Sequence, residues 1–501
     1  MLPSQTTHTR RPRPWSLLSL AALGCGALPV SASSTPSAAF LQNTGDKANR
    51  VDILFVGDGY TAAEMSTYAD HIDAVLDHMF DTGGINAGVT NPYARYQNFF
   101  NIIRVDAQSN ESGVDRYDHV TNQPIELVDT VFKGALGRTA PQSLTIDYLF
   151  AAPPIISAAL APLGYTYTAF QGSDTDWQFA AVNTTYYGGE ASSYATFSAG
   201  HADAAELALH EGGHWNHDLG DEYGGNPAPF PFIANEVNLD LDHTGDDWAH
   251  WLGYLDPQTG PVAAYPGGRG YDTGVYHPSP DSKMRILGAA FDPVAREKII
   301  LDIYALVDPI DDHLDNNPTY NESDDLWIDV VDTDVLMIEW LVNGQAIAGQ
   351  SSETLDLSAV ISQLGPGSHT ITARAYDSIL DHNFSDNNDP DPLDLVRRDL
   401  DQLEQSVAFS VDIAYLPGDT DFDGDIDQHD LNTILQHYNT AVPPGDAANG
   451  DVTGDGEVGI EDLDLALARW TGETLPLLVP EPIAALPLLI LTFLHRPRSR
   501  S

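Results

Sequence analysis

The sequence predicts a multidomain protein in which a mixed α/β domain comes first, a β-sandwich second and a small helical module last. The chain has 501 residues, too many for one hydrophobic core. In its first part the apolar residues form short runs and stretches with helical spacing, whereas around Trp340 they alternate. Two matched acidic loops then follow, each running into an apolar helix.

The composition of the chain sets the expected boundaries. We expect an N-terminal segment at 1–32, an α/β domain at 33–308, a β-sandwich at 318–414, a small helical module at 415–472 and a C-terminal segment at 478–501. The segment between the first two domains is rich in Asp, Asn and Pro, which is typical of a linker.

Acidic residues dominate the charge. Asp and Glu total 73 against 22 Lys and Arg, a formal net charge of −51. Nucleic acid is therefore not an expected partner, because its phosphate backbone would be repelled. Such a charge suits an exported protein that binds calcium, and it says nothing about the fold.

The N-terminus has the parts of an export signal. Three arginines at 10–13 precede a mostly apolar stretch at 15–30, and Ala32 ends a small-residue cleavage site. The only cysteine, Cys25, lies inside this segment. The mature chain would then contain no disulfide and no catalytic thiol.

Patterning predicts the elements of the α/β domain. We expect strands at 51–56, 99–105 and 179–183, and helices that begin at Thr61, Leu144 and Val294. Thr61 with Glu64 three residues later is a capping box. The helix expected at 144–160 is interrupted by Pro153-Pro154.

The central motif is His210-Glu211-Gly212-Gly213-His214. On a helix, positions i and i+4 share a face, so His210 and His214 can offer two imidazole nitrogens to one metal. Glu211 beside that metal can take a proton from bound water. Zinc suits this chemistry, since it accepts nitrogen and oxygen ligands and leaves a position open for water.

The flanking residues frame the motif. Asp203 with Glu206 is a capping-box-like start, and Gly220 is a helix stop that would turn the chain back toward the histidines. Asp221 is then the expected third ligand, with Glu222 and His217 as rivals. His217 can equally be a solvated histidine at the helix end.

The run from His210 to Tyr223 resembles the signature of the IgA-peptidase-type zinc metallopeptidases, which read H-E-x-G-H, a spacer and then Asp-Glu-Tyr. Further blocks of the chain resemble the same family: Val51 to Thr61, Pro92 to Asn101, Gly274 to Pro278 and Ser282 to Arg285. The resemblance covers about residues 46–308, and the family often has Cys at the position of Ser282.

This resemblance implies a metzincin-like fold and one catalytic zinc. Met284 would be the Met-turn residue under the metal, and the strand at 179–183 would be an edge strand that pairs with an extended substrate. Tyr276 is a candidate donor to the developing oxyanion, a group that such sites need. The nearby His243, His250 and His277 are not compelling ligands by spacing.

In the second domain, apolar and polar residues alternate in three places, at 338–342, 370–376 and 407–411. Asn343-Gly344 is a hairpin signal. Short alternating runs of this kind predict a β-sandwich, broadly immunoglobulin-like. No catalytic cluster is recognisable there, so we expect a spacer or a substrate-positioning domain.

The two acidic loops have calcium-loop spacing, with ligands at positions 1, 3, 5, 7 and 12. The expected ligands are Asp419, Asp421, Asp423, Asp425 and Asp430 in the first loop, and Asp451, Thr453, Asp455, Glu457 and Asp462 in the second. The pair resembles a dockerin type I module, which implies two calcium ions and a cohesin-like partner. The second loop has fewer carboxylates, so we expect weaker binding there.

The C-terminus combines Pro480-Glu481-Pro482, an apolar run at 483–494 and a basic tail. This pattern resembles a PEP-CTERM sorting signal, which implies processing by an exosortase. The apolar run is shorter than the about 20 residues that a membrane span needs.

Together these features predict an exported or surface-sorted zinc endopeptidase that acts on protein or peptide substrates. The alternative is a non-catalytic, calcium-dependent surface adhesin or scaffold that retains a structural metal site. Glu211 separates the two hypotheses, because a structural site does not need a base.

Overall fold

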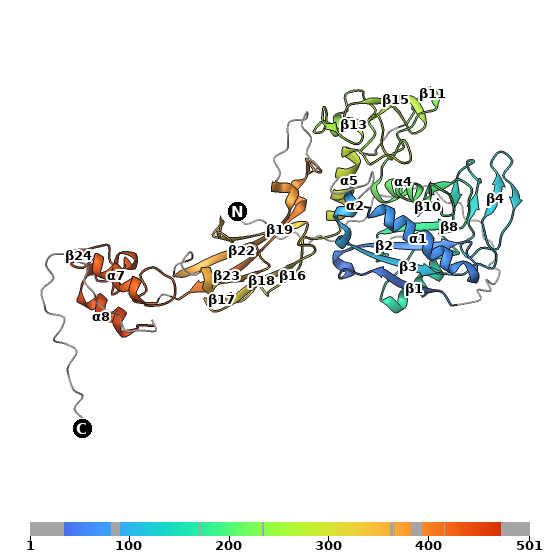
Figure 1. Cartoon of the computed structure of the whole chain (residues 1–501). Coiled ribbons are helices and arrows are strands. Elements are labelled where there is room, and N and C mark those ends of the chain that lie inside the picture. The colour runs from blue at the N-terminus through green and yellow to red at the C-terminus, as the bar shows by residue number, and fades with distance from the viewer. Residues whose placement is uncertain are drawn as a thin grey trace.

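The computed structural model describes residues 35–81, 91–169, 172–232, 235–360, 364, 366–381, 393–414 and 416–471. The expected signal peptide and sorting signal lie outside these residues. Among the described helices, none is both long and apolar enough to cross a membrane. Figure 1 shows three parts in a row: a large α/β part, a β part and a small helical part.

A six-stranded sheet forms the centre of the first part, in the order β1-β3-β2-β8-β10-β9. Its strands are β1 (Ser37–Gln42), β2 (Val51–Asp58), β3 (Phe100–Asp106), β8 (Trp177–Val182), β9 (Gly189–Ala191) and β10 (Ala195–Ser198). The pairs β2–β3, β2–β8 and β8–β10 are parallel, whereas β1 and β9 pair antiparallel at the two edges. The expected strands at 51–56 and 99–105 are confirmed.

Helices cover both faces of this sheet. Along β2, Ile53 and Phe55 face one apolar cluster and Leu54 and Val56 face another, as the two-residue period of a strand requires. The first cluster receives α1 (Met65–Met79), α4 (Ala204–His217) and α5 (Pro293–Tyr304), and the second receives α3 (Ala152–Leu160). A short helix, α2 (Pro92–Arg95), precedes β3.

Smaller sheets surround the main one. One has the order β5-β4-β6-β7 and contains β4 (Asp115–Asp118), β5 (Gln123–Glu126), β6 (Ala135–Leu136) and β7 (Leu144–Thr145). A second has the order β11-β15-β14 and contains β11 (Asn226–Pro229), β14 (Tyr265–Gly268) and β15 (Tyr271–His277). The third is the pair β12 (Leu255–Asp256) and β13 (Gly260–Pro261).

Several expected boundaries need correction. The helix expected at 144–160 begins only at Ala152, because Leu144–Thr145 pairs with β6, and the two prolines occupy the first helical turn, where no amide bond is lost. The capping box at Thr61 is present. Asp203 makes no side-chain cap on α4, and that helix ends at Asp218, whose φ of 52° is left-handed, rather than at Gly220.

The second part contains two sheets. One has the order β16-β18-β21, with β16 (Ile310–His313), β18 (Asp325–Val330) and β21 (Thr354–Asp356). The other has the order β17-β23-β22-β19-β20, with β17 (Thr319–Tyr320), β19 (Leu336–Val342), β20 (Gln345–Ala346), β22 (Gly367–Asp377) and β23 (Glu404–Ile413). The Asn343-Gly344 hairpin joins β19 to β20, with positive φ at both residues.

The first and second parts share one apolar cluster and a buried polar junction. The Asp377 carboxylate, at the end of β22, is fully buried and accepts hydrogen bonds from Tyr96 Oη at 2.6 Å and Tyr304 Oη at 2.7 Å. Arg95 Nη2 donates to the same carboxylate at 2.6 Å. The β part is therefore built into the α/β part rather than tethered to it.

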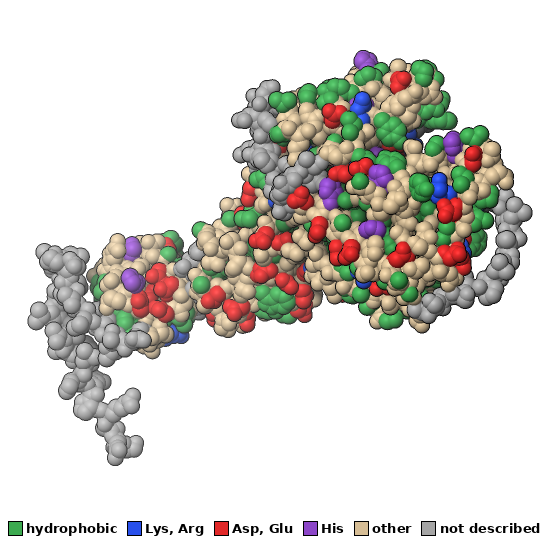
Figure 2. Space-filling view, turned by 45° about the vertical axis from the view of Figure 1, so that its right-hand side comes forward, with side chains coloured by type: hydrophobic (Ala, Val, Ile, Leu, Met, Phe, Trp, Pro, Cys, Tyr) green, Lys and Arg blue, Asp and Glu red, His purple; other side chains and the backbone are tan. Residues whose placement is uncertain are grey.

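The third part consists of α7 (Gln428–Gln436), α8 (Ile460–Ala468) and the short pair β24 (Thr440–Ala441) and β25 (Glu457–Val458). The two helices pack around a small core that includes Leu431, Ile434 and Leu463. Figure 2 shows acidic side chains gathered over the second and third parts.

Candidate active site

Helix α4 carries both histidines and Glu211 from the middle of the first part. Its two glycines allow close packing against two different neighbours. A Cβ on Gly212 would lie 3.1 Å from the ring of Phe179 in β8, and one on Gly213 would lie 2.6 Å from Met284 Sδ. The glycines therefore weaken the helix intrinsically but let it lie close to the sheet and to the segment around Met284.

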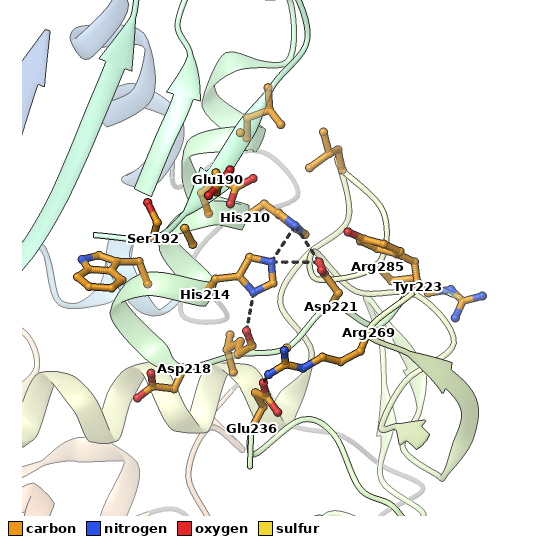
Figure 3. Close-up of a pocket in the computed structure, with 18 of the residues that line it drawn as sticks. Glu190, Ser192, His210, His214, Asp218, Asp221, Tyr223, Glu236, Arg269 and Arg285 are labelled. Carbon is orange, nitrogen blue, oxygen red and sulfur yellow. Dashed lines mark hydrogen bonds and ion pairs between the residues drawn. The ribbon is translucent and has the colours of Figure 1, made fainter. Parts of the chain in front are cut away.

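Three side chains converge at one point (Figure 3). His210 Nε2 and His214 Nε2 are 3.2 Å apart, and Asp221 Oδ1 lies 3.3 Å and 3.0 Å from them. A tetrahedral zinc with bonds of about 2.0–2.1 Å needs ligand atoms about 3.3–3.4 Å apart. The triangle is close to that size, so the three atoms can share one zinc ion.

The outer nitrogens of the two histidines support the same conclusion. His210 Nδ1 lies 2.9 Å from the Lys283 carbonyl, and His214 Nδ1 lies 2.6 Å from the Leu219 carbonyl. A carbonyl only accepts, so each Nδ1 carries the proton and each Nε2 presents a lone pair. A metal ion between these atoms would satisfy two imidazole nitrogens and a carboxylate oxygen at 3.0–3.3 Å, so the donor set fits a metal ion.

The rival third ligands lie elsewhere. His217 is fully buried, with Nδ1 at 2.9 Å from Asp302 Oδ2 and Nε2 at 3.0 Å from Tyr93 Oη. Glu222 is also fully buried and accepts from Asn238 Nδ2 at 2.8 Å. Burial, and then the neighbouring Asp292, raises the pKa of Glu222 well above its ordinary value. Asp221 is the residue that the structure brings to the histidines.

Glu211 lies beside this triad, 8% exposed, against the edge strand β9. A Cβ on Gly189 would collide with the Glu211 carboxylate, so the absence of a side chain at Gly189 provides the space that this carboxylate occupies. Burial raises the pKa of Glu211 to about 7, with Asp221 and Glu190 acting in the same direction and His210 against it.

A cleft of about 1090 Å³ opens over the triad. Its lining includes Gly189, Glu190 and Ala191 of β9, which is the edge of the sheet on this side. The sequence-based expectation for the edge strand was therefore wrong. The strand at 177–182 is internal, hydrogen-bonded to β2 and β10, because the chain turns back after Tyr187 and adds β9 at the outside.

Tyr276 needs correction as the candidate oxyanion donor. It does not line the cleft: its backbone pairs with Asp240 and its ring lies 6.4 Å from that of His243. Two other tyrosines line the cleft instead, Tyr187 and Tyr223. The signal for Tyr223 was its place two residues after Asp221, whereas no sequence pattern marks Tyr187.

Met284 is fully buried beneath Gly213 of α4, the position that a Met-turn residue would take. Its carbonyl accepts a hydrogen bond from the Glu222 amide at 2.9 Å. The segment around Met284 thus fixes His210 through Lys283 and the third-ligand loop through Glu222. None of His243, His250 and His277 lines the cleft.

The expected calcium loops form two matched turns before α7 and α8. Carboxylate oxygens of Asp419, Asp421 and Asp423 lie within 4.8 Å of one another, and so do those of Asp425, Asp427 and Asp430. Asp427, at position 9 of the loop, belongs to the second group, although it was not among the expected calcium ligands. Within the described residues no such group forms in the second loop.

The fold and the site bring together two histidines from one helix and a carboxylate from the following loop, which is the donor set of an HExxH metal centre. Residues 39–257, less than half of the chain, match the family model described as IgA Peptidase M64. The match includes the triad and Glu211 and supports an IgA-peptidase-type metallopeptidase. No curated protein matches the chain.

Proposed function

We propose that the chain is a secreted or cell-surface zinc-dependent endopeptidase in which Glu211 is the general base. The observation that carries this proposal is the triangle of His210, His214 and Asp221, which has the size that zinc requires and lies at the floor of an open cleft. Three protein ligands leave a fourth position for water, which is the arrangement of catalytic rather than structural zinc sites.

Zinc bound here would polarise a peptide carbonyl and lower the pKa of a water molecule. Glu211 would accept the proton of that water and later deliver it to the leaving amine. The phenols of Tyr187 and Tyr223 are the nearest candidates to donate to the developing oxyanion. Burial, and then nearby carboxylates, raises the pKa of both tyrosines. Both phenols therefore stay protonated and can donate a hydrogen bond.

The edge strand β9 offers a place for the substrate backbone. Its inner side pairs with β10, and its outer side borders the cleft. The Gly189 amide already donates to the Gln142 carbonyl at 3.1 Å, so an extended peptide would add with main-chain hydrogen bonds to the rest of this edge, which suits binding of a peptide independent of its sequence. Selectivity would then come from side chains along the cleft.

The alternative of a scaffold with a structural metal is less well supported. A structural zinc site is closed by four protein ligands, whereas this triad opens to a cleft. A structural zinc site also has no need of a neighbouring carboxylate such as Glu211, for which Gly189 leaves space.

The C-terminal parts are proposed to attach the enzyme. We propose two calcium ions in the loops that begin at Asp419 and Asp451, with the module binding a cohesin-like or other surface partner. Export through the N-terminal signal and exosortase-type processing at 478–501 rest on the sequence alone.

The test compares the full chain with Glu211→Gln. We expect about one zinc per chain in both proteins by metal analysis. Cleavage of a quenched-fluorescent peptide library is expected to fall by about 100- to 10,000-fold in the variant, the usual contribution of a general base. Equal cleavage by both proteins, or no bound zinc in either, would refute the proposal.

A further inference from the structure

Two arginines line the cleft, and they differ in how their charge is compensated. Arg269 forms an ion pair with Glu236, so its charge is neutralised within the protein. No described carboxylate forms an ion pair with Arg285. Arg285 also lies beyond residues 39–257, the range matched by the family model.

The groups that position Arg285 are formally neutral acceptors. Its Nη1 donates to the Glu222 carbonyl at 3.2 Å and to His277 Nε2 at 2.8 Å. His277 is 1% exposed, and burial followed by the Arg285 charge lowers its pKa to about 4. The imidazole is therefore uncharged at neutral pH, and it fixes the guanidinium without cancelling its charge.

These two bonds use Nη1 only. A guanidinium has five N–H donors, and its Nε–Nη2 edge has the spacing of a carboxylate. No described residue accepts a hydrogen bond from that edge of Arg285. Arg285 comes from the segment directly after Met284 and lines the same wall of the cleft as Tyr223 (Figure 3).

We propose that Arg285 binds a carboxylate group of the substrate through its Nε–Nη2 edge and so selects peptides that carry negative charge where they pass this wall of the cleft. This inference rests on the proposed peptidase function and names its substrate preference. The carboxylate can belong to an Asp or Glu side chain or to the end of the substrate chain. Both present the same planar, bidentate acceptor to the guanidinium.

The test uses the full chain with quenched-fluorescent peptides that differ only in Glu or Gln at one position. We expect wild type to show a Glu-over-Gln preference in kcat/KM of about tenfold or more at one position, the usual value of a charged hydrogen bond. Arg285→Gln should reduce that ratio to near one, and Arg285→Glu should favour Lys at the same position. If the bound group is the chain end, the tenfold ratio will instead separate free-acid from C-terminally amidated peptides.

Arg269→Gln is the matched control, because this arginine lines the same cleft but is ion-paired. It should leave the Glu-to-Gln ratio unchanged. A purely structural role for Arg285 predicts that Arg285→Gln lowers kcat/KM for all peptides equally, and that result would overturn the inference.

Failure of the proposed function is distinguishable from failure of this inference. If wild type cleaves none of the peptides, binding of the same labelled Glu and Gln peptides is measured by fluorescence anisotropy. Tighter binding of the Glu peptide that disappears in Arg285→Gln would support the carboxylate site without catalysis. Equal binding of both peptides would overturn it.

Discussion

Two regions of the described chain gather side chains that could hold a metal ion, and these regions are built in opposite ways. At the triad, backbone carbonyls of Lys283 and Leu219 orient two imidazoles through their Nδ1 atoms, and the ligand atoms already stand 3.0–3.3 Å apart. In the first acidic loop, all the gathered side chains are carboxylates. Asp419 is 4% exposed there, and its Oδ1 atom has no hydrogen-bond partner.

The difference shows which ligands can be assembled before the metal arrives. Imidazoles that are held at Nδ1 by backbone carbonyls keep their orientation without the metal, so packing can arrange them in advance. Buried carboxylates of like charge raise one another's pKa and cost stability until a cation or a proton compensates them. Burial, with Asp430 and Asp423 adding to it, raises the pKa of Asp419 to about 6. Zinc loss should therefore change activity more than fold, and calcium loss should change the fold of the third part.

The largest effect is expected for Asp221→Asn. The amide is uncharged and a poor zinc ligand, so we expect zinc affinity to fall by at least about 100-fold, more than the loss of a group that only hydrogen-bonds to a ligand usually causes. Competition with a chromophoric chelator measures the affinity, and circular dichroism should show an intact fold.

Glu222→Gln is the matched control for the third ligand. The Glu222 carboxyl is buried, and burial and Asp292 raise its pKa, so an amide of the same shape suits this position. We expect zinc affinity to change by less than about tenfold. Loss of zinc in Glu222→Gln with retention in Asp221→Asn would reverse the assignment.

Gly189→Ala should separate catalysis from metal binding. The added Cβ collides with the Glu211 carboxylate but not with the triad, so Glu211 must move while zinc remains. We expect kcat/KM to fall by about 100-fold, within the range for a displaced general base. Zinc content and the melting temperature serve as controls. Unchanged peptide cleavage would show that the position of Glu211 is not critical.

Parts of this fold were predictable because they depend on local pattern. The apolar run of β2, the capping box at Thr61 and the alternation in β19, β22 and β23 all gave correct elements. The edge strand β9 was not predictable in this way. It has three residues, two of them Gly and Ala, and its place depends on pairing with β10 and not on its own propensity.

In the candidate site, too, the residues set by local pattern were predictable and those set by long-range packing were not. The spacing of His210, Glu211 and His214 follows from helix geometry, and Asp221 was favoured from the turn after the helix. Tyr276 was misassigned, and Arg285 was recognised only as part of a family block, because their relation to the cleft depends on how β14, β15 and the Met284 segment fold back over α4. No local sequence pattern encodes such long-range packing.

Calcium should act on the third part and leave catalysis unchanged. At 100-fold excess over its Kd a ligand stabilises the folded state by about 2.7 kcal/mol, which for a module of this size corresponds to roughly 10–20 °C in Tm. We expect differential scanning calorimetry to show this shift for one transition of the full chain. Asp430→Asn should reduce the shift, and peptide cleavage should be the same with and without calcium. If no thermal transition of the full chain shifts with calcium, the proposed calcium binding by these loops is contradicted.

The smallest and sharpest effect concerns the first residue of each loop, measured without calcium. Asp451 accepts amide hydrogen bonds from Gly445, Gly454 and Gly456, and these outweigh burial and lower its pKa, whereas the pKa of Asp419 is raised. At pH 7 the charge on Asp451 therefore contributes stability and the charge on Asp419 costs it. We expect Asp451→Asn to lower the calcium-free Tm of this module by about 2–4 °C and Asp419→Asn to raise it by a similar amount. Tm shifts of the same sign would mean that the charges on Asp419 and Asp451 affect stability in the same way. The contrast between a site arranged before the metal binds and a site destabilised by its own charges would then not apply to the two loops.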